Sequence, residues 1–132
     1  MSTYEIMLPY TKPPLSLNQR LHWAVKAKLV KEVRTTTARL AEQLQIPPLE
    51  AVEITLIYTP KTARKRDTDN LFATLKPAVD GLVDAGILAD DNTEIVKKLS
   101  VLIKNPSKNQ PQLAILLQLS SEKCTEKLSE KE

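Results

Sequence analysis

Four short apolar runs and two longer segments with helical spacing constrain the fold of this chain more than any single motif. The short runs are residues 3–9, 51–59, 95–104 and 112–119. In the first two, apolar and polar side chains alternate, which is typical of strands with one buried face. The order of these segments predicts an α+β fold of the type β-α-β-α-β-β, with two main helices packed on a small mixed β-sheet. We expect residues 1–119 to form a single domain.

Proline, glycine and capping residues mark where the helices begin and end. Ser16 or Asn18 can cap a first helix that continues to about Gln45, before Pro47-Pro48. Its predicted apolar face consists of Val30, Val33, Thr37, Leu40, Ala41 and Leu44. The second helix can begin at Asp67, Thr68 or Asp69, and Gly86 is its natural C-terminal stop. The polar segment 105–111 is expected to be a long hairpin connection between the last two strands.

Composition limits the class of protein. The 132 residues are 42% hydrophobic and 27% charged, as in ordinary soluble globular proteins. No apolar run approaches the roughly 18 residues of a membrane span, and the N-terminus lacks a signal-peptide pattern, so a cytoplasmic location is expected. The single cysteine, Cys124, allows neither an intrachain disulfide nor a cysteine zinc cluster. Residues 120–132 alternate Glu and Lys and are expected to form a charged tail, as a solvated helix or a disordered segment.

The charged residues are distributed unevenly along the chain. All six aspartates lie between Asp67 and Asp91, and a basic run of Lys61, Arg64, Lys65 and Arg66 leads into the first of them. Clustered carboxylates repel one another, so a cation or a bound proton usually offsets them. Residues 1–66 carry eleven Lys/Arg and five Glu, which gives +6, whereas residues 67–132 carry eight Lys/Arg and eleven acids, which gives −3. Solvated faces are the commoner origin of such runs, but a phosphodiester enzyme would also need this arrangement.

The second helix places charged residues on one face. At about 100° per residue, Asp69, Lys76 and Asp80 fall within about 40° of one another, opposite an apolar band. A helix of about 17 residues would span roughly 25 Å, which would keep Asp67 and Asp91 apart. The acids could still meet if the helix begins later, if it bends at Pro77, or if residues 81–91 fold back along it. A dimer partner could also supply one end.

The donor types indicate which metal such a site would prefer. Oxygen donors without a usable thiol favour Mg²⁺, with Mn²⁺ as a substitute, over zinc. The spacing does not match an EF-hand loop, and the chain has neither a glycine-rich phosphate loop nor a Gly-x-Ser-x-Gly elbow. The lone His22, beside Trp23, is most simply a packing or hydrogen-bonding residue. The alternative is that this loop stacks on or contacts a nucleic acid.

These residues together match a family pattern. Arg66-Asp67-Thr68-Asp69-Asn70-Leu71, Lys76, Asp80-Gly81-Leu82, Ala85-Gly86-Ile87 and Asp90-Asp91 resemble the signature of the RusA-type Holliday-junction resolvases. These proteins are bacterial and phage crossover-junction endodeoxyribonucleases. The resemblance covers about residues 4–119.

The resemblance implies an activity and roles for individual residues. It implies a homodimer that binds four-way DNA junctions and, with Mg²⁺, nicks two strands symmetrically in DNA recombination and repair. The metal-binding acids would be Asp67, Asp69 and Asp91, with Asp90 beside the last. The catalytic lysine would be Lys76, which lies about one turn further along the helix than in the best-known members. The expected DNA contacts are Lys61, Arg64, Lys65, Arg66 and Asn70.

Two other functions fit the same residues. One is a different Mg²⁺-dependent nuclease that acts on other branched DNA, because the same ligands serve any phosphodiester. The other is a DNA-junction-binding module that does not cleave.

Overall fold

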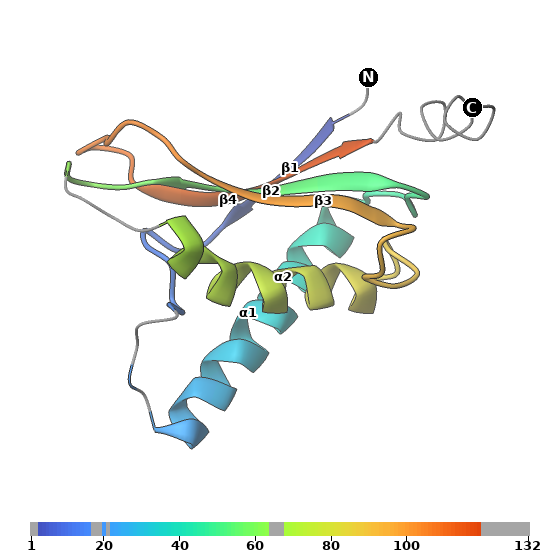
Figure 1. The fold of residues 1–132 in the computed structure, drawn as a ribbon, viewed down its shortest axis with the longest axis horizontal. Helices are drawn as coiled ribbons and strands as arrows, with labels where there is room; N and C mark the ends of the chain where they lie inside the picture. Colours follow the sequence, from blue (N-terminus) through green and yellow to red (C-terminus); the bar gives the residue numbers. More distant parts are fainter. Residues whose placement is uncertain (1–2, 17–19, 21, 64–67, 120–132) are drawn as a thin grey trace, which may run out of the picture.

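A computed structural model describes residues 3–16, 20, 22–63 and 68–119 of the chain. Its elements follow the predicted order and are β1 (Thr3–Leu8), α1 (Trp23–Gln43), β2 (Val52–Thr59), the 3₁₀-helix η1 (Thr68–Leu71), α2 (Phe72–Asp84), β3 (Val96–Ile103) and β4 (Gln112–Leu119). The four strands form one mixed sheet, and both helices lie on the same side of it (Figure 1). The predicted α+β fold is therefore confirmed. The charged tail, residues 120–132, lies outside the described residues.

The strand order is β1-β4-β2-β3, and it corrects the hairpin predicted for the last two strands. β4 pairs antiparallel with both β1 and β2, whereas β3 pairs parallel with β2 at the sheet edge. Segment 105–111 therefore passes the end of β2, where the Lys104 N–H donates to the Tyr58 carbonyl and the Ser107 N–H to the Pro60 carbonyl. The physical reason is burial. β4 carries a nearly continuous apolar run that suits an interior strand, while β3 carries lysines that suit an edge.

Helix α1 begins later than the expected caps Ser16 or Asn18. Its first residue is Trp23, and the Nδ1 atom of His22 accepts a hydrogen bond from the Ala24 N–H at 3.1 Å. The chain before the helix is bound to α2 at the buried Leu15. The Leu15 N–H donates to the Thr74 hydroxyl at 3.2 Å, and this hydroxyl donates to the Leu15 carbonyl at 2.7 Å. Asn18 itself lies outside the described residues.

The predicted apolar face of α1 is correct except at its end. Val33, Thr37 and Ala41 are buried, and Val30 and Leu40 are partly buried. Leu44 is 53% exposed. The helix stops at Gln43 and the chain turns at Gln45, which has φ of 55°, so Leu44 never reaches the core.

The two helices approach each other closely at Gly81. A Cβ atom at this position would collide with the Arg34 carbonyl oxygen of α1 and would lie 3.1 Å from the Thr37 Cβ. Beside this contact, the Arg34 guanidinium forms a bidentate pair with the Asp84 carboxylate, at 2.5 and 2.8 Å. Glycine therefore fixes how near the two backbones lie, and the ion pair lies beside this contact.

A search of the described residues finds no helix with the length and apolar character that a membrane span requires.

Candidate active site

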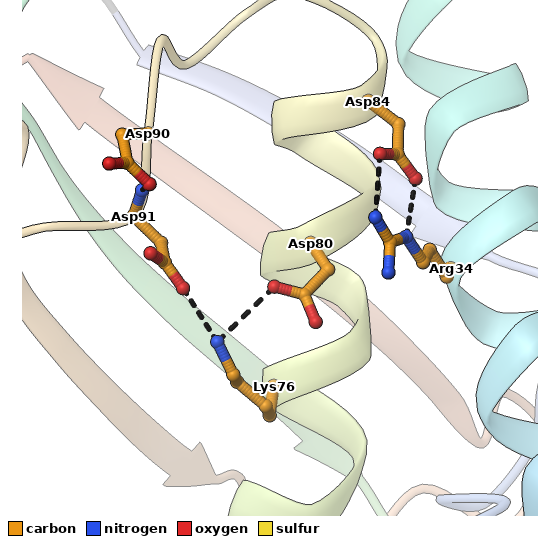
Figure 2. A network of polar contacts seen from close by, with 6 residues as sticks. All are labelled: Arg34, Lys76, Asp80, Asp84, Asp90 and Asp91. Carbon is orange, nitrogen blue, oxygen red and sulfur yellow. Dashed lines mark hydrogen bonds and ion pairs between the residues drawn. The ribbon is translucent and has the colours of Figure 1, made fainter.

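The candidate active site centres on the ammonium group of Lys76. Its Nζ lies 2.6 Å from Asp91 Oδ2 and 3.2 Å from Asp80 Oδ1 (Figure 2). Lys76 and Asp80 come from neighbouring turns of α2, and Asp91 comes from the loop that follows the helix. One cation thus joins two carboxylates from separate parts of the chain.

The C-terminal turn of α2 directs the chain back towards Lys76. The Ile87 N–H donates to the Leu82 carbonyl and the Gly86 N–H to the Val83 carbonyl, which is the Schellman pattern. Gly86 has the positive φ of 81° that this turn requires, so the predicted stop is confirmed. Ile87 and Leu88 are then buried in the core, and this burial anchors the returning segment.

The path of α2 and of the chain after it bears on the predicted separation of Asp67 and Asp91. The α-helix begins at Phe72, later than Asp67–Asp69, and it runs without a break through Pro77 to Asp84. The chain after Asp84 folds back, so Asp91 meets Lys76 in the second turn of the helix. Of the three intrachain possibilities, the structure shows the later start and the folding back, whereas Asp67 itself lies outside the described residues.

Asp90 differs from Asp91 in its surroundings. Its Oδ1 atom accepts the Asp91 N–H at 2.7 Å and its Oδ2 atom accepts from the Asn92 side-chain amide at 3.4 Å. Asn92 in turn accepts the Glu94 N–H at 3.0 Å. In Figure 2 the Asp90 carboxylate points away from Lys76, while that of Asp91 points towards it. Asp90 therefore shapes the turn that presents Asp91.

The ion pair shifts the titration of both partners. The hydrogen bond from Lys76, reinforced by Coulomb attraction, lowers the pKa of Asp91 below its usual value. The hydrogen bond to Asp91 raises the pKa of Lys76, with a smaller contribution from Asp80. Both pKa shifts stabilise the charged forms that the two side chains already carry at neutral pH, a protonated lysine and an ionised aspartate.

Several predicted site residues fall outside the description. Arg64, Lys65, Arg66 and Asp67 lie outside the described residues, and Asp69 is placed only as part of the η1 backbone. Asn70 is half-buried and Lys61 is exposed. Asp80, which binds Lys76, was not among the predicted site residues. Its spacing of four residues from Lys76 on the charged helix face was the available signal.

The donor set fits a hard cation in type. The described carboxylates near Lys76 offer only oxygen, which Mg²⁺ prefers. Among the side chains that the structure describes, no three Asp, Glu, His or Cys residues gather closely enough to hold a metal ion by themselves.

Comparison with known proteins gives a relative without an assigned activity. No family model matches the chain. A protein of Xylella fastidiosa (strain Temecula1 / ATCC 700964), described as an "Uncharacterized protein", is 32% identical over 85 residues. The aligned region covers 61% of this chain and 56% of the relative, so the chain spans little more than half of that protein's length.

Proposed function

We propose that this protein is a Mg²⁺-dependent, structure-selective endodeoxyribonuclease of the RusA type, which resolves four-way DNA junctions by paired symmetric nicks. The observation that carries the proposal is the contact of Asp91 with Lys76. It brings the loop acid of the motif to the charged face of α2, the helix that begins at Phe72, directly after η1 (Thr68–Leu71). Sequence-distant acids and one lysine beside a basic segment suit phosphodiester hydrolysis better than any other chemistry considered above.

Each residue has a distinct part in this mechanism. Asp67, Asp69 and Asp91 would hold Mg²⁺, which would supply Lewis-acid polarisation of the scissile phosphate and a bound water of lowered pKa. Lys76 is protonated at neutral pH, as lysines ordinarily are, and Asp91 raises its pKa further, so its ammonium can offset charge that develops on the phosphoryl oxygens. Asp80 holds the Lys76 side chain from one helical turn away.

The remaining predicted residues position the DNA. Lys61, Arg64, Lys65, Arg66 and Asn70 bind the sugar-phosphate backbone on either side of the cut, which provides affinity and register without reading bases. A homodimer suits the substrate, because a four-way junction has near two-fold symmetry and two equivalent sites can cut opposed strands together. We propose that the enzyme is bacterial or phage-encoded and acts in the cytoplasm.

A gel assay with a synthetic four-way junction, with and without Mg²⁺, tests the activity. We expect wild-type protein to nick the junction only with the metal, and Asp69→Asn to abolish nicking while junction binding stays equal or tightens, because a repulsive charge is removed. Asp84→Asn is the matched control, since it makes the same change at a carboxylate of α2 that binds Arg34 and is not among the proposed metal ligands. Equal losses in both variants, or loss of binding and fold in Asp69→Asn, would count against a catalytic role.

The same assay separates the alternative functions. Matched fork and linear duplexes, run beside the junction, distinguish a junction resolvase from a nuclease with another branched substrate. Junction binding without nicking under any divalent metal would identify a binding module.

A further inference from the structure

We infer that the outer part of α1 is a second DNA contact, which stacks Trp23 on an unpaired base and holds the adjoining phosphates with lysines. This part is residues 22–31, hereafter the α1 arm. That the partner is DNA rests on the proposed function. The α1 arm is a surface separate from the Lys76 site.

The α1 arm projects from the body of the protein. Figure 1 shows the N-terminal end of α1 as the end farther from the sheet. Every residue from His22 to Lys28 is exposed, and Trp23 is 76% exposed, the largest value among the exposed large hydrophobic residues that the structure describes. A large aromatic side chain left in water is informative because such residues usually find a covering surface.

The position of Trp23 on the helix explains why the monomer leaves it uncovered. Counting back in steps of three or four residues from the buried Val33 and Thr37 leads through Val30 and Ala27 to Trp23. The tryptophan thus continues the stripe that packs on α2, but beyond the place where α2 can reach it. The apolar face of α1 therefore extends beyond the part of the helix that packs on α2.

The tryptophan ring lies beside the ring of His22. The His22 ring lies 5.5 Å from the Trp23 ring, centroid to centroid, with planes inclined by 31°. His22 is itself held by the hydrogen bond from the Ala24 N–H to its Nδ1 atom. Because the Nδ1 atom accepts this hydrogen bond, the Nε2 atom is the one that can donate to a phosphate. Such a partly ordered aromatic pair loses less freedom when it binds a ligand.

The positive charge of the α1 arm indicates a negatively charged partner. The arm carries Lys26, Lys28 and Lys31, with the exposed Arg20 just before it, and no acid occurs between Glu5 and Glu32. Cations that flank an exposed aromatic ring are the combination that single-stranded nucleic acids bind. A second copy of this chain fits less well, because a symmetric contact would bring two such basic arms together.

The chain contains a single tryptophan, so its fluorescence reports on the arm directly. In buffer without divalent metal, we expect oligothymidylate to quench Trp23 fluorescence more strongly than a blunt duplex of equal length. With a fluorescently labelled strand, Trp23→Ala should weaken binding about 5- to 150-fold, the range for one stacked base. Trp23→Phe should restore most of the affinity. Leu44→Ala, which removes an exposed apolar side chain at the other end of α1, should leave it unchanged.

The lysines provide an independent readout. Lys26→Ala and Lys31→Ala should each reduce the slope of log affinity against log salt by about 0.7 for a single strand. Lys98→Ala, at an exposed position on β3, should not change it.

The outcomes separate this inference from the proposed function. Quenching and a Trp23 effect without any junction nicking would leave the inference standing and remove the proposed activity. Normal nicking with unchanged strand affinity in Trp23→Ala would overturn the inference alone. It would also be overturned if Trp23→Ala dissociated a dimer in sedimentation while strand affinity stayed the same, because the arm would then be an interface between copies.

Discussion

At the scale of single residues, Lys76 acts through position more than through stability. Its side chain is 63% exposed, and exposed ion pairs contribute only about 0–1 kcal/mol. The two contacts therefore add little to the folding free energy. They do fix where the ammonium lies and which carboxylates lie beside it, and this would matter to the proposed reaction, which develops charge on phosphate oxygens.

We expect a graded response to substitutions around Lys76. Lys76→Met and Asp91→Asn should each lower the nicking rate by about 10²-fold or more, the usual loss when a charge that stabilises the transition state is removed. Asp80→Asn should cost only a few-fold, because Asp80 contacts Lys76 at the longer distance of 3.2 Å and only positions it. Single-turnover rates on a junction measure this order. A loss in Asp80→Asn as large as in Asp91→Asn would contradict it.

The ion pair between Arg34 and Asp84 is expected to make the free energy of unfolding depend on pH. The hydrogen bonds from Arg34 lower the pKa of Asp84 in the folded protein. A carboxylate with a lowered pKa stabilises the fold above its unfolded pKa of about 3.9, and this contribution is lost as the pH falls towards the folded pKa. Asp84→Asn should therefore be less stable than wild type at pH 7, and the difference should shrink below about pH 4. Urea unfolding across this range is the measurement, and a constant difference would show that the pair does not titrate with folding.

At the scale of elements, the contact between α1 and α2 depends on the absence of a side chain at Gly81. Glycine inside a helix normally costs about 1 kcal/mol relative to alanine. Here the backbone of α1 occupies the space that a Cβ atom would need. The steric requirement therefore outweighs helix propensity at this position.

Gly81→Ala should consequently destabilise the protein although it favours the isolated helix. Overpacking of this kind typically costs about 1–3 kcal/mol. Urea unfolding measures the change, and Ala85→Gly serves as a control for propensity at the end of the same helix. If Gly81→Ala were more stable than wild type, the two helices would not lie as close as described.

At the scale of the whole molecule, the sheet topology gathers basic residues at one end. Because β2 and β3 are parallel, the segments that follow them leave from the same end of the sheet. There the Lys104 N–H donates to the Tyr58 carbonyl and the Ser107 N–H to the Pro60 carbonyl. This places Lys61, which follows β2, on the same side of the fold as the segment that follows β3. Lys61, Lys104 and Lys108 therefore lie at the same end of the sheet.

Removing this charge should change the salt dependence of DNA binding. The triple change Arg64→Ala, Lys65→Ala and Arg66→Ala should weaken binding to all DNA sequences alike. It should also reduce the slope of log affinity against log salt by about 2.7 on duplex arms. Lys98→Ala is again the control. An unchanged slope would rule out this run as a phosphate contact.

Local patterns in the sequence determined the elements of this protein. Alternation in residues 3–9 and 51–59, the helical period around Val33 and Thr37, and the stop at Gly86 all rest on interactions within a few residues, so they could be predicted from the chain alone. The charged face that carries Lys76 and Asp80 was predictable for the same reason.

Only the tertiary structure decided how these elements combine. The interior place of β4, the late start of α1 and the pairing of Arg34 with Asp84, fifty residues apart, each depend on contacts between distant segments. The return of Asp91 to Lys76 has the same origin: Gly86 permits the turn, but burial of Ile87 and Leu88 sets its direction. Secondary structure follows from the period of a local pattern, whereas strand order and the assembly of the site follow from which apolar surfaces can cover one another.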